Sequence, residues 1–243
     1  MGRRLKVLFI VLLFFDNSLF AQQALKPFPQ HATYAKGSIK PNHIQQAKLD
    51  HLTLIFYEQW KKRYIKPGCH PGEHYVWFER KGNKQSVSEG QGYGMVITAL
   101  MAGADPAAKQ TYDGLYQYYH AHPGNHPYLM AWAQKKNCKD LDKSSATDGD
   151  MDIAYSLLLA DKQWGSNGAI NYLKEAQKMI AAIMQHEINP KTYSILLSDA
   201  IEYDSKDYFD TRSSDFMPAH FKAFEKATND KRWGKVISNT YKL

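Results

Sequence analysis

The sequence carries two acidic, glycine-rich segments, VSEGQGYGM at Val87–Met95 and ATDGDMDIAY at Ala146–Tyr155. In the first segment, Glu89 stands among three glycines and a tyrosine, directly before the apolar run Met95–Met101. Glycines at alternate positions let a backbone turn tightly and come close to a ligand. The apolar run ends at Ala102-Gly103, as a buried helix does. We therefore expect Glu89 on a constrained turn that opens onto a cleft. A carboxylate that merely caps the helix N-terminus is the alternative.

The second segment places three aspartates at alternate positions, which invites comparison with a calcium-binding loop. An EF-hand loop starting at Asp148 needs glycine at its sixth position and glutamate at its twelfth. Ile153 and Leu159 stand there instead. On a helix of about 3.6 residues per turn, Asp148 and Asp152 share a face while Asp150 points elsewhere. One aspartate can thus face a cleft while another caps the helix.

Other catalytic and cofactor motifs fail on their spacing. Cys69, His70 and His74 lack the second ligand pair of a zinc site, and His186-Glu187 is not part of a His-Glu-x-x-His unit. The glycines of the first segment lack the spacing of a dinucleotide-binding fingerprint. A Gly-x-Ser-x-Gly nucleophile motif is absent from the sequence. We expect no metal and no cofactor, which leaves paired carboxylates as the candidate chemistry.

The composition is that of an ordinary globular protein. The chain has 243 residues, of which 44% are apolar, which is enough for one packed domain. The formal net charge is +7, but the basic residues are scattered. The run Lys61-Lys62-Arg63 falls on the polar side of an expected amphipathic helix. We therefore expect no nucleic-acid partner.

The N-terminus has the layout of a secretory signal. Arg3, Arg4 and Lys6 precede the apolar run Val7–Phe15, which is too short to span a bilayer. A buried helix is disfavoured because these cations would lie beside it. We expect cleavage at Ala21-Gln22, so that residues 1–21 are a signal peptide and residues 22–243 a single domain. The mature chain is then secreted or periplasmic, without a membrane anchor.

Two cysteines fall in loop-like segments of this exported chain. Cys69 and Cys138 can pair in an oxidising compartment. Two free thiols remain the alternative, because the sequence does not fix how close the two residues lie.

Apolar residues recur at helical spacing over most of the chain, with no repeat or low-complexity linker. Short extended pieces are expected at Tyr75–Phe78 and Thr192–Leu197. About seven helices are expected: three at residues 41–65, 95–102 and 105–120, a fourth that carries the second acidic segment and continues to Trp164, and three more at residues 169–188, 210–227 and 232–241. The chain is therefore predicted to be all-α, with polar residues held in the loops.

Aromatic residues accompany the acids along the sequence. Rings beside carboxylates suit a sugar chain, because the apolar C–H faces of a sugar stack on them. Tyr93, Trp132 and Tyr155 are the candidates for such contacts. Trp164 and Trp233 lie near helix ends, and we expect them to be core residues.

These segments resemble the signatures of glycoside hydrolase family 8, which are inverting, endo-acting enzymes such as endoglucanases, lichenases, chitosanases and xylanases. Three segments match: Ser88–Met95, Ala146–Tyr155 running on to Trp164, and Asp215–Pro218. The resemblance extends from about Tyr34 to the C-terminus. It implies an (α/α)6 toroid with a long substrate groove and a polysaccharide substrate, glucan foremost. We expect a monomer.

The resemblance also implies roles for individual residues. Glu89 is the general acid that protonates the glycosidic oxygen, and Asp148 holds and distorts the sugar at the cleavage point. We expect Tyr93, Asp150, Trp132 and Tyr155 to contact the substrate. The general base is a further acid across the sugar, with room for a water between.

The sequence departs from the family in its number of helices. A complete toroid has about twelve, and about seven are expected before Leu243. The family's base lies well beyond the segment that matches Asp215–Pro218, so we expect a chain truncated at its C-terminus. The alternative to an enzyme is a catalytically inactive remnant or a polysaccharide-binding protein. If the chain is active, its base must be sought among these aspartates: Asp199, Asp204, Asp207, Asp210 and Asp215.

Overall fold

The computed structural model describes residues 24–26, 36–39, 41–78 and 81–242. The predicted signal peptide, residues 1–21, lies outside the described residues. Of the described helices, none is long and apolar enough to cross a membrane. The α-helices are α1 (Gln46–Tyr64), α2 (Ser88–Leu100), α3 (Ala108–Ala121), α4 (Thr147–Trp164), α5 (Tyr172–His186), α6 (Pro218–Thr228) and α7 (Arg232–Thr240).

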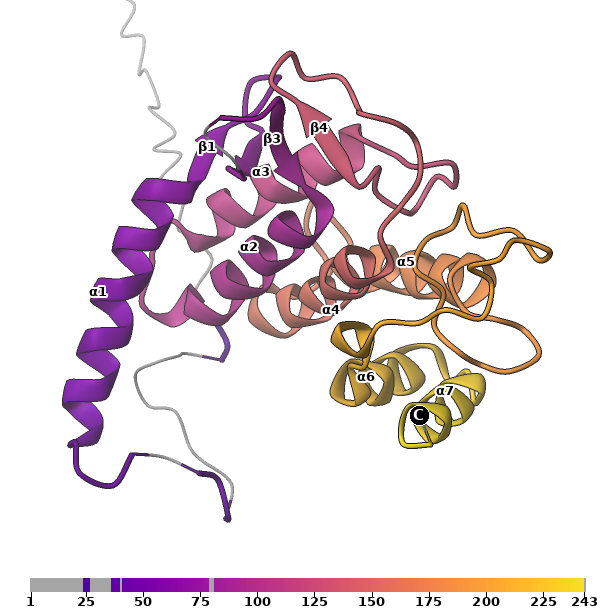
Figure 1. Ribbon diagram of the computed structural model, residues 1–243. Helices are drawn as coiled ribbons and strands as arrows, with labels where there is room; N and C mark the ends of the chain where they lie inside the picture. The colour runs from indigo at the N-terminus through magenta and orange to yellow at the C-terminus, as the bar shows by residue number, and fades with distance from the viewer. Residues whose placement is uncertain (1–23, 27–35, 40, 79–80, 243) are drawn as a thin grey trace, which may run out of the picture.

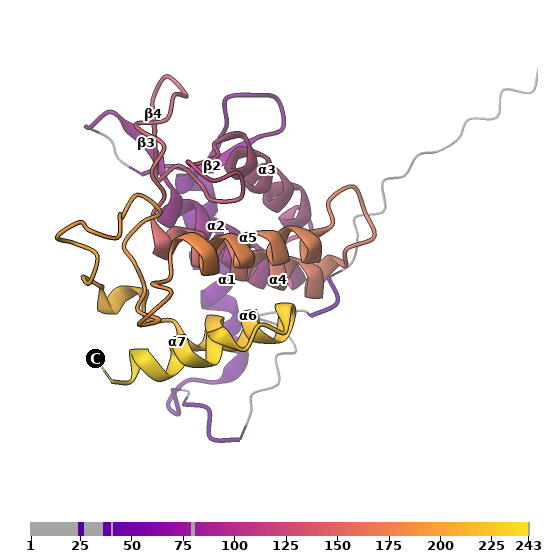
Figure 2. The same cartoon turned by 90° about the vertical axis from the view of Figure 1, so that its right-hand side faces the viewer.

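Most of these helices pair as consecutive hairpins. Helix α3 packs on α2, α5 on α4, and α7 on α6, while α4 contacts both α2 and α6. Helices α2, α4 and α6 therefore form an inner row, and α3, α5 and α7 lie outside it (Figures 1 and 2). Helix α1 lies at one end of the row (Figure 1). The expected all-α class is confirmed.

Four short strands join the helices at one end of the molecule. Strand β1 (Ile65–Pro67) pairs antiparallel with β2 (His74–Val76), and β3 (Lys84–Val87) pairs antiparallel with β4 (Ala133–Lys135). Strand β3 runs directly into α2. The small sheets thereby fix the point at which the first acidic segment begins.

The core lies between the two rows of helices. Ala176, Met179, Ile180 and Ile183 form the apolar stripe of α5, and all four are buried. Facing them, α4 buries an apolar face of its own. Such stripes contribute most of the stability of a helical domain, at about 25 cal/mol per Å² of apolar surface buried.

Two tryptophans expected in the core are found there. Trp164 and Trp233 are both buried, which confirms that prediction. Trp164 packs against Tyr112 with ring centroids 5.3 Å apart, and Trp233 stacks on Phe221 at 5.6 Å. Trp164 thus joins α4 to the neighbouring outer helix α3, and Trp233 joins α7 to its inner partner α6.

The expected constrained turn at Glu89 is wrong, because helix α2 already begins at Ser88. Glu89 lies in the first turn of the helix, which agrees with the alternative of a carboxylate at the helix N-terminus. The glycines of this segment serve helix packing instead. A Cβ added to Gly92 would lie 2.7 Å from the Cβ of Asp152 on α4, closer than real side chains approach. Glycine is needed here so that α2 and α4 can cross closely.

Helices α1 and α3 begin later than the sequence suggests. Helix α1 starts at Gln46 rather than at residue 41. Helix α3 starts at Ala108, three residues after Asp105. Oδ1 of Asp105 accepts the backbone N–H of Ala107 at 2.9 Å, so a local hydrogen bond is present just ahead of the helix. Oδ2 accepts hydrogen bonds from the Tyr57 hydroxyl (2.6 Å) and the Lys61 ammonium (2.5 Å), which tie Asp105 to α1.

Helix α6 is shorter than the expected helix at residues 210–227. It starts at Pro218, which occupies a first-turn position where its missing N–H costs nothing. The residue before a proline disfavours helical geometry, and Met217 is accordingly non-helical. A single 3₁₀ turn, η2 (Ser213–Asp215), precedes it. The polar residues of this segment therefore lie in a loop ahead of α6.

Cys69 and Cys138 form a disulfide bond, which resolves the alternative left by the sequence. The bond joins the loop between β1 and β2 to the turn after β4, with the two Cα atoms 5.9 Å apart. It encloses a sequence separation of 69 residues. The disulfide thus fastens the two small sheets to each other.

Candidate active site

The candidate site lies where the inner helices begin. Glu89 is in the first turn of α2, and Asp148 is in the first turn of α4. Arg212 immediately precedes η2, ahead of α6. Partial burial lowers the pKa of the Arg212 guanidinium, but the negative charges of Asp215, Asp148 and Glu89 outweigh burial and raise the pKa above its usual value. Residues from the first turns of α2 and α4 and from the segment ahead of α6 therefore meet at one end of the row.

Glu89 is the exposed acid of this site. Its Oε1 accepts a hydrogen bond from the hydroxyl of Tyr93, one helical turn further along α2, at 3.1 Å. Partial burial, followed by the charge of Glu89, raises the pKa of Tyr93 to about 12. Tyr93 therefore stays a donor near neutral pH, while the other oxygen of Glu89 is available to a substrate.

Asp148 has a contrasting environment, since the residue is only 8% exposed. Its Oδ1 accepts the backbone N–H of Gly149 at 2.9 Å. The same oxygen lies 3.5 Å from Nη2 of Arg212. Asp148 is thus a fixed carboxylate beside a cation, whereas Glu89 faces solvent.

Arg212 was missed by the sequence analysis. Its Nε and Nη2 both donate to Oδ2 of Asp215 at 3.2 Å. The Asp215 side chain is fully buried and also accepts a hydrogen bond from Ser214. Burial raises the pKa of Asp215, although Arg212 acts in the opposite direction. The spacing of three residues between arginine and aspartate was the available signal.

A second pair links α4 to α6. Nε2 of His220 lies 2.9 Å from Oδ1 of Asp152, and the His220 ring stacks on Tyr155 with centroids 3.9 Å apart. The expected shared face of Asp148 and Asp152 fits this placement, since Asp148 and Asp152 both affect the pKa of Tyr93. Tyr155 is half-buried at this junction. His220 was not singled out from the sequence.

Trp132 lies beside the start of α2. Its backbone carbonyl accepts the N–H of Ser88 at 2.9 Å, and its indole N–H donates to Asp142 at 2.9 Å. The ammonium of Lys84 lies 5.0 Å from the centre of the ring. The backbone of Trp132 therefore adjoins the start of α2 while its ring is held by Asp142 and Lys84, and its role in substrate contact stays a prediction.

Asp150 lies behind the site, although we expected it to contact the substrate. The residue is fully buried, and its Oδ1 accepts the backbone N–H of Met130 at 2.9 Å. With no exposed surface, this side chain has no direct route to a sugar in this structure. The prediction that it contacts the substrate gains no support from the geometry.

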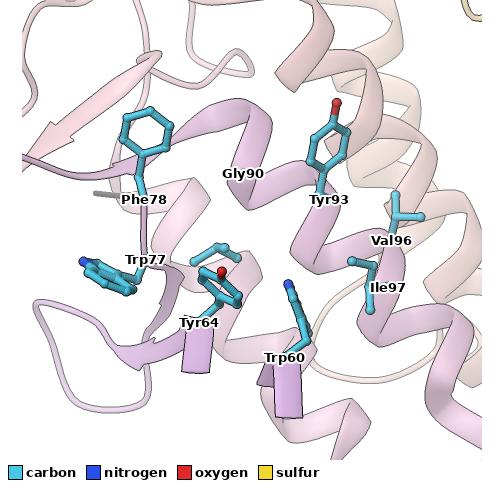
Figure 3. A pocket seen from close by; sticks show the side chains of 9 residues that line it. Trp60, Tyr64, Trp77, Phe78, Gly90, Tyr93, Val96 and Ile97 are labelled. Carbon is cyan, nitrogen blue, oxygen red and sulfur yellow. The ribbon is translucent and has the colours of Figure 1, made fainter. Parts of the chain in front are cut away.

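An aromatic pocket of about 320 Å³ lies along the other side of Tyr93. Figure 3 shows rings from α1 and from the segment after β2 facing the side chains of α2 across it. The pocket is lined by Trp60, Tyr64, Val76, Trp77, Phe78, Gly90, Tyr93, Val96 and Ile97. Apart from its two tyrosines, the lining carries no ionisable side chain. The pocket offers an apolar surface rather than acid–base chemistry.

Metal-ligand chemistry finds no place among the described residues, where no group of three or more His, Cys, Asp or Glu side chains could hold a metal ion. Helical hairpins that bring carboxylates together at the start of their inner helices are the arrangement expected of an (α/α)-type glycosidase domain.

The chain belongs to glycoside hydrolase family 8. The family model described as "Glycosyl hydrolases family 8" matches residues 27–243. The family expected from the acidic segments is therefore confirmed. Solved structures similar to this chain have the (α/α)6 fold, which confirms the expected fold class for the part that the chain matches.

Two curated relatives are similar over nearly all of the chain. A β-glucanase of Niallia circulans is 50% identical over 90% of this chain and 53% of its own length. An endoglucanase of Bacillus sp. (strain KSM-330) is 47% identical over 89% of this chain and 48% of its own length. The chain thus spans about half the length of the curated relatives it matches.

The solved structures include a similar protein. The apo structure of a β-1,3-1,4-glucanase from Paenibacillus sp. X4 superposes with a TM-score of 0.85 at 50% identity. The match covers 90% of this chain and 57% of the Paenibacillus chain. The arrangement of hairpins described above is therefore shared with a solved relative.

Proposed function

We propose that this chain acts in the hydrolysis of internal β-1,4-glycosidic bonds of a glucan, with inversion at the anomeric carbon. Glu89 is the general acid and Asp148 holds the sugar. The observation that carries the proposal is the contrast between these two carboxylates at adjoining helix ends. Glu89 is exposed and hydrogen-bonded to a tyrosine, while Asp148 is nearly buried beside Arg212.

The contrast suits a division of labour between proton transfer and substrate binding. An exposed carboxyl group can deliver a proton to the glycosidic oxygen as the bond to the leaving sugar breaks. A fixed carboxylate can accept hydrogen bonds from sugar hydroxyls and stabilise the positive charge that develops on the ring. Tyr93 orients the acid, and Tyr155 and Trp132 offer rings to the sugar faces.

Inversion requires a second carboxylate that activates water across the sugar. Asp215 is a poor candidate, because its side chain is fully buried and bound by Arg212 and Ser214. Asp199 accepts the backbone N–H of Ser145 at 2.8 Å. Within the described chain this leaves Asp204, Asp207 and Asp210, on the loop between α5 and η2, as the acids whose replacement would test for a base.

The proposed substrate is a β-glucan, and the proposed location is outside the cytoplasm. Relatives of similar sequence are named β-glucanase and endoglucanase, and the Paenibacillus relative is named β-1,3-1,4-glucanase. Mixed-linkage glucan is therefore the first substrate to test. The predicted signal peptide at residues 1–21 supports export.

The second candidate function is polysaccharide binding without hydrolysis. One observation favours it: the acids nearest the site other than Glu89 and Asp148 are tied into hydrogen bonds and ion pairs. In that case the groove binds a sugar chain, but no water is activated. The two functions differ in turnover and not in binding.

The test measures hydrolysis and binding side by side. We expect the chain to release reducing ends from mixed-linkage glucan, with the α-anomer formed first in ¹H NMR spectra. Glu89→Gln should lower turnover by about 10²–10⁴-fold, because proton donation is lost. Oligosaccharide binding by Glu89→Gln, followed by titration calorimetry, should be preserved. Glu202→Gln, an exposed acid in the loop after α5, is the matched control and should behave as the unmodified chain.

The outcomes separate the candidates. Initial release of the β-anomer contradicts inversion, and full turnover by Glu89→Gln removes Glu89 from its role. Binding of glucan oligosaccharides without hydrolysis establishes the second candidate. Absence of both binding and hydrolysis refutes both functions for this chain.

A further inference from the structure

A second acidic cluster lies behind the first turn of α4, away from the exposed Glu89. Asp150 on α4 and Glu187 at the end of α5 are both 0% exposed. One oxygen of each is satisfied: Asp150 Oδ1 by the Met130 N–H at 2.9 Å, and Glu187 Oε1 by the Ser145 hydroxyl at 2.5 Å. The second oxygen of each, Oδ2 and Oε2, is buried without a hydrogen bond. The Thr147 hydroxyl, also buried without a partner, is a neutral donor within reach of Glu187 but offers nothing to Asp150.

The two unsatisfied oxygens belong to neighbouring side chains, because each carboxyl group is within hydrogen-bonding reach of the other. Two ionised carboxylates offer only acceptors, so neither can satisfy the other. One proton between Oδ2 and Oε2 satisfies both oxygens at once. A carboxyl pair that excludes water and contains one proton is the familiar solution to two buried acids at close range.

No cation compensates this cluster in the part of the chain that the structure describes. None of the ion pairs there includes Asp150, Glu187 or Asp199. Asp199, from the loop after α5, adds a third negative charge that acts on both members of the pair. The charge balance thus favours a protonated pair.

The other titratable groups around the pair do not change this balance. Tyr119 of α3 faces Asp150, and burial followed by the charge of Asp150 raises the pKa of Tyr119 well above its usual range. His186 precedes Glu187 and stacks on His126 with ring centroids 3.4 Å apart. Burial, followed by the charge of His126, lowers the pKa of His186. His186 is therefore a poor source of positive charge near neutral pH.

We propose that Asp150 and Glu187 share one proton between Oδ2 and Oε2, and that this pair positions Asp148, two residues earlier on α4. Two hydrogen bonds hold the pair in place. Asp150 accepts the N–H of Met130, and Glu187, directly after α5, accepts the hydroxyl of Ser145 in the segment that enters α4. The positioning of Asp148 matters for hydrolysis only if the proposed function holds.

The titration of the pair follows from its burial. Burial, followed by the charge of Glu187, raises the pKa of Asp150 well above its usual range. Burial is also the main cause that raises the pKa of Glu187 to about 7. The folded chain therefore keeps a proton that the unfolded chain releases near pH 4.5, the ordinary value for glutamate. The contribution of the pair to stability is fully present below that pH and is lost as the pH rises through neutrality. Once the proton is lost to solvent, two buried negative charges repel each other near the start of α4.

The first experiment needs no enzymatic activity. We expect the Tm of the unmodified chain to fall by several degrees between pH 5 and pH 8. Glu187→Gln and Asp150→Asn should flatten this dependence, because an amide N–H takes the place of the shared proton. Glu202→Gln changes an exposed acid and should keep the full slope. Equal slopes in all four proteins would overturn the shared proton.

A residue-specific readout accompanies the melts. In ¹³C NMR spectra of the side-chain carboxyl groups, the unmodified chain should show a resonance that titrates near neutrality. That resonance should be missing from both Glu187→Gln and Asp150→Asn and present in Glu202→Gln. The N–H of Met130, which donates to Asp150, should shift with the same midpoint. Independent titration of the two acids near pH 4 contradicts the proposal.

The positioning role is tested by rescue. Glu187→Ala should lower glucan turnover, or oligosaccharide affinity if turnover is absent, by about 10-fold, as expected when one or more hydrogen bonds that position a group are lost. Glu187→Gln should recover most of that loss at pH 6. Equal defects in both variants would show that the pair does not position Asp148. The melts and NMR titration remain decisive if glucan hydrolysis itself fails, so the two proposals fail separately.

Discussion

A Cβ added to Gly149 would lie 2.4 Å from the Oγ of Ser88, so the backbones of α4 and α2 meet at the residues that carry the site. The same Cβ would lie 2.7 Å from the backbone nitrogen of Glu89. Because the first turns of the two helices touch, Glu89 and Asp148 lie at adjoining helix ends. The glycine of the second acidic segment is thus a packing residue.

Gly149→Ala should destabilise the chain. Alanine gains up to about 1 kcal/mol of helix propensity over glycine. That gain is outweighed by overlap with the backbone at Glu89, which cannot rotate away, and overpacking costs about 1–3 kcal/mol. Urea unfolding should show a lower midpoint. Gly168→Ala is the control, since its Cβ would meet nothing within 4 Å. A Gly149→Ala chain as stable as the control would refute the close crossing.

Arg212→Gln should destabilise the chain by about 1–2 kcal/mol, because it leaves the buried Asp215 without a cation. We place the effect below that of a fully buried pair because the Arg212 side chain is 44% exposed. Adding Asp215→Asn should recover part of the loss. Removing the surface pair by Arg232→Gln should cost less than about 1 kcal/mol. Strict additivity in the double-mutant cycle would argue against the pair.

Tyr93 should ionise only at high pH, with a pKa of about 12. Negative charges oppose formation of a phenolate, so Glu89→Gln should lower the Tyr93 pKa. It should stay above the ordinary value of 10.0, because partial burial is the larger cause. The ¹³Cζ resonances of tyrosine, followed against pH, report this. Tyr203, whose pKa is lowered by Lys191, should not respond. An unchanged Tyr93 titration in Glu89→Gln would contradict the hydrogen bond.

Replacing both Cys69 and Cys138 by serine should lower stability by about 2–4 kcal/mol. The disulfide closes a loop of 69 residues, and a long loop restricts the unfolded chain strongly. Chemical unfolding with and without a reducing agent measures the effect. The reductant should destabilise the unmodified chain and leave the double-serine variant unchanged. A sensitive double-serine variant would point to a cause other than the disulfide.

The helices and the acids of the site could be predicted because both leave local patterns in the sequence. Apolar spacing marks a helix wherever it lies, and it indicated every α-helix of the described chain. Glu89 and Asp148 stood out because each lies in a short segment of unusual composition. Trp164 and Trp233 were assigned to the core from their positions near helix ends. Each of these inferences needs only residues that are close in the sequence.

The remainder depends on contacts between distant residues. The glycines near Glu89 suggested a tight turn, since one segment does not reveal that α4 packs against it. Asp150 lies beside Glu187, immediately after the next helix, and nothing local marks that proximity. Arg212 lies beside Asp148 only because the loop before α6 folds back against the start of α4, which the sequence does not indicate. The same holds for Asp105, whose second oxygen binds Tyr57 and Lys61 of α1, a contact that no local pattern indicates.

The assembly of the site from three inner helices has a consequence for its dynamics. Proteins open in cooperative units, and a single helical hairpin can detach at a smaller free-energy cost than that of global unfolding. Release of α6 and α7 alone would take Arg212 away from Asp148 and His220 away from Asp152, while Glu89 and Asp148 stayed folded. The temperature up to which the site stays assembled is then set by the hairpin with the lowest protection against amide hydrogen exchange, and not by the melting of the whole chain.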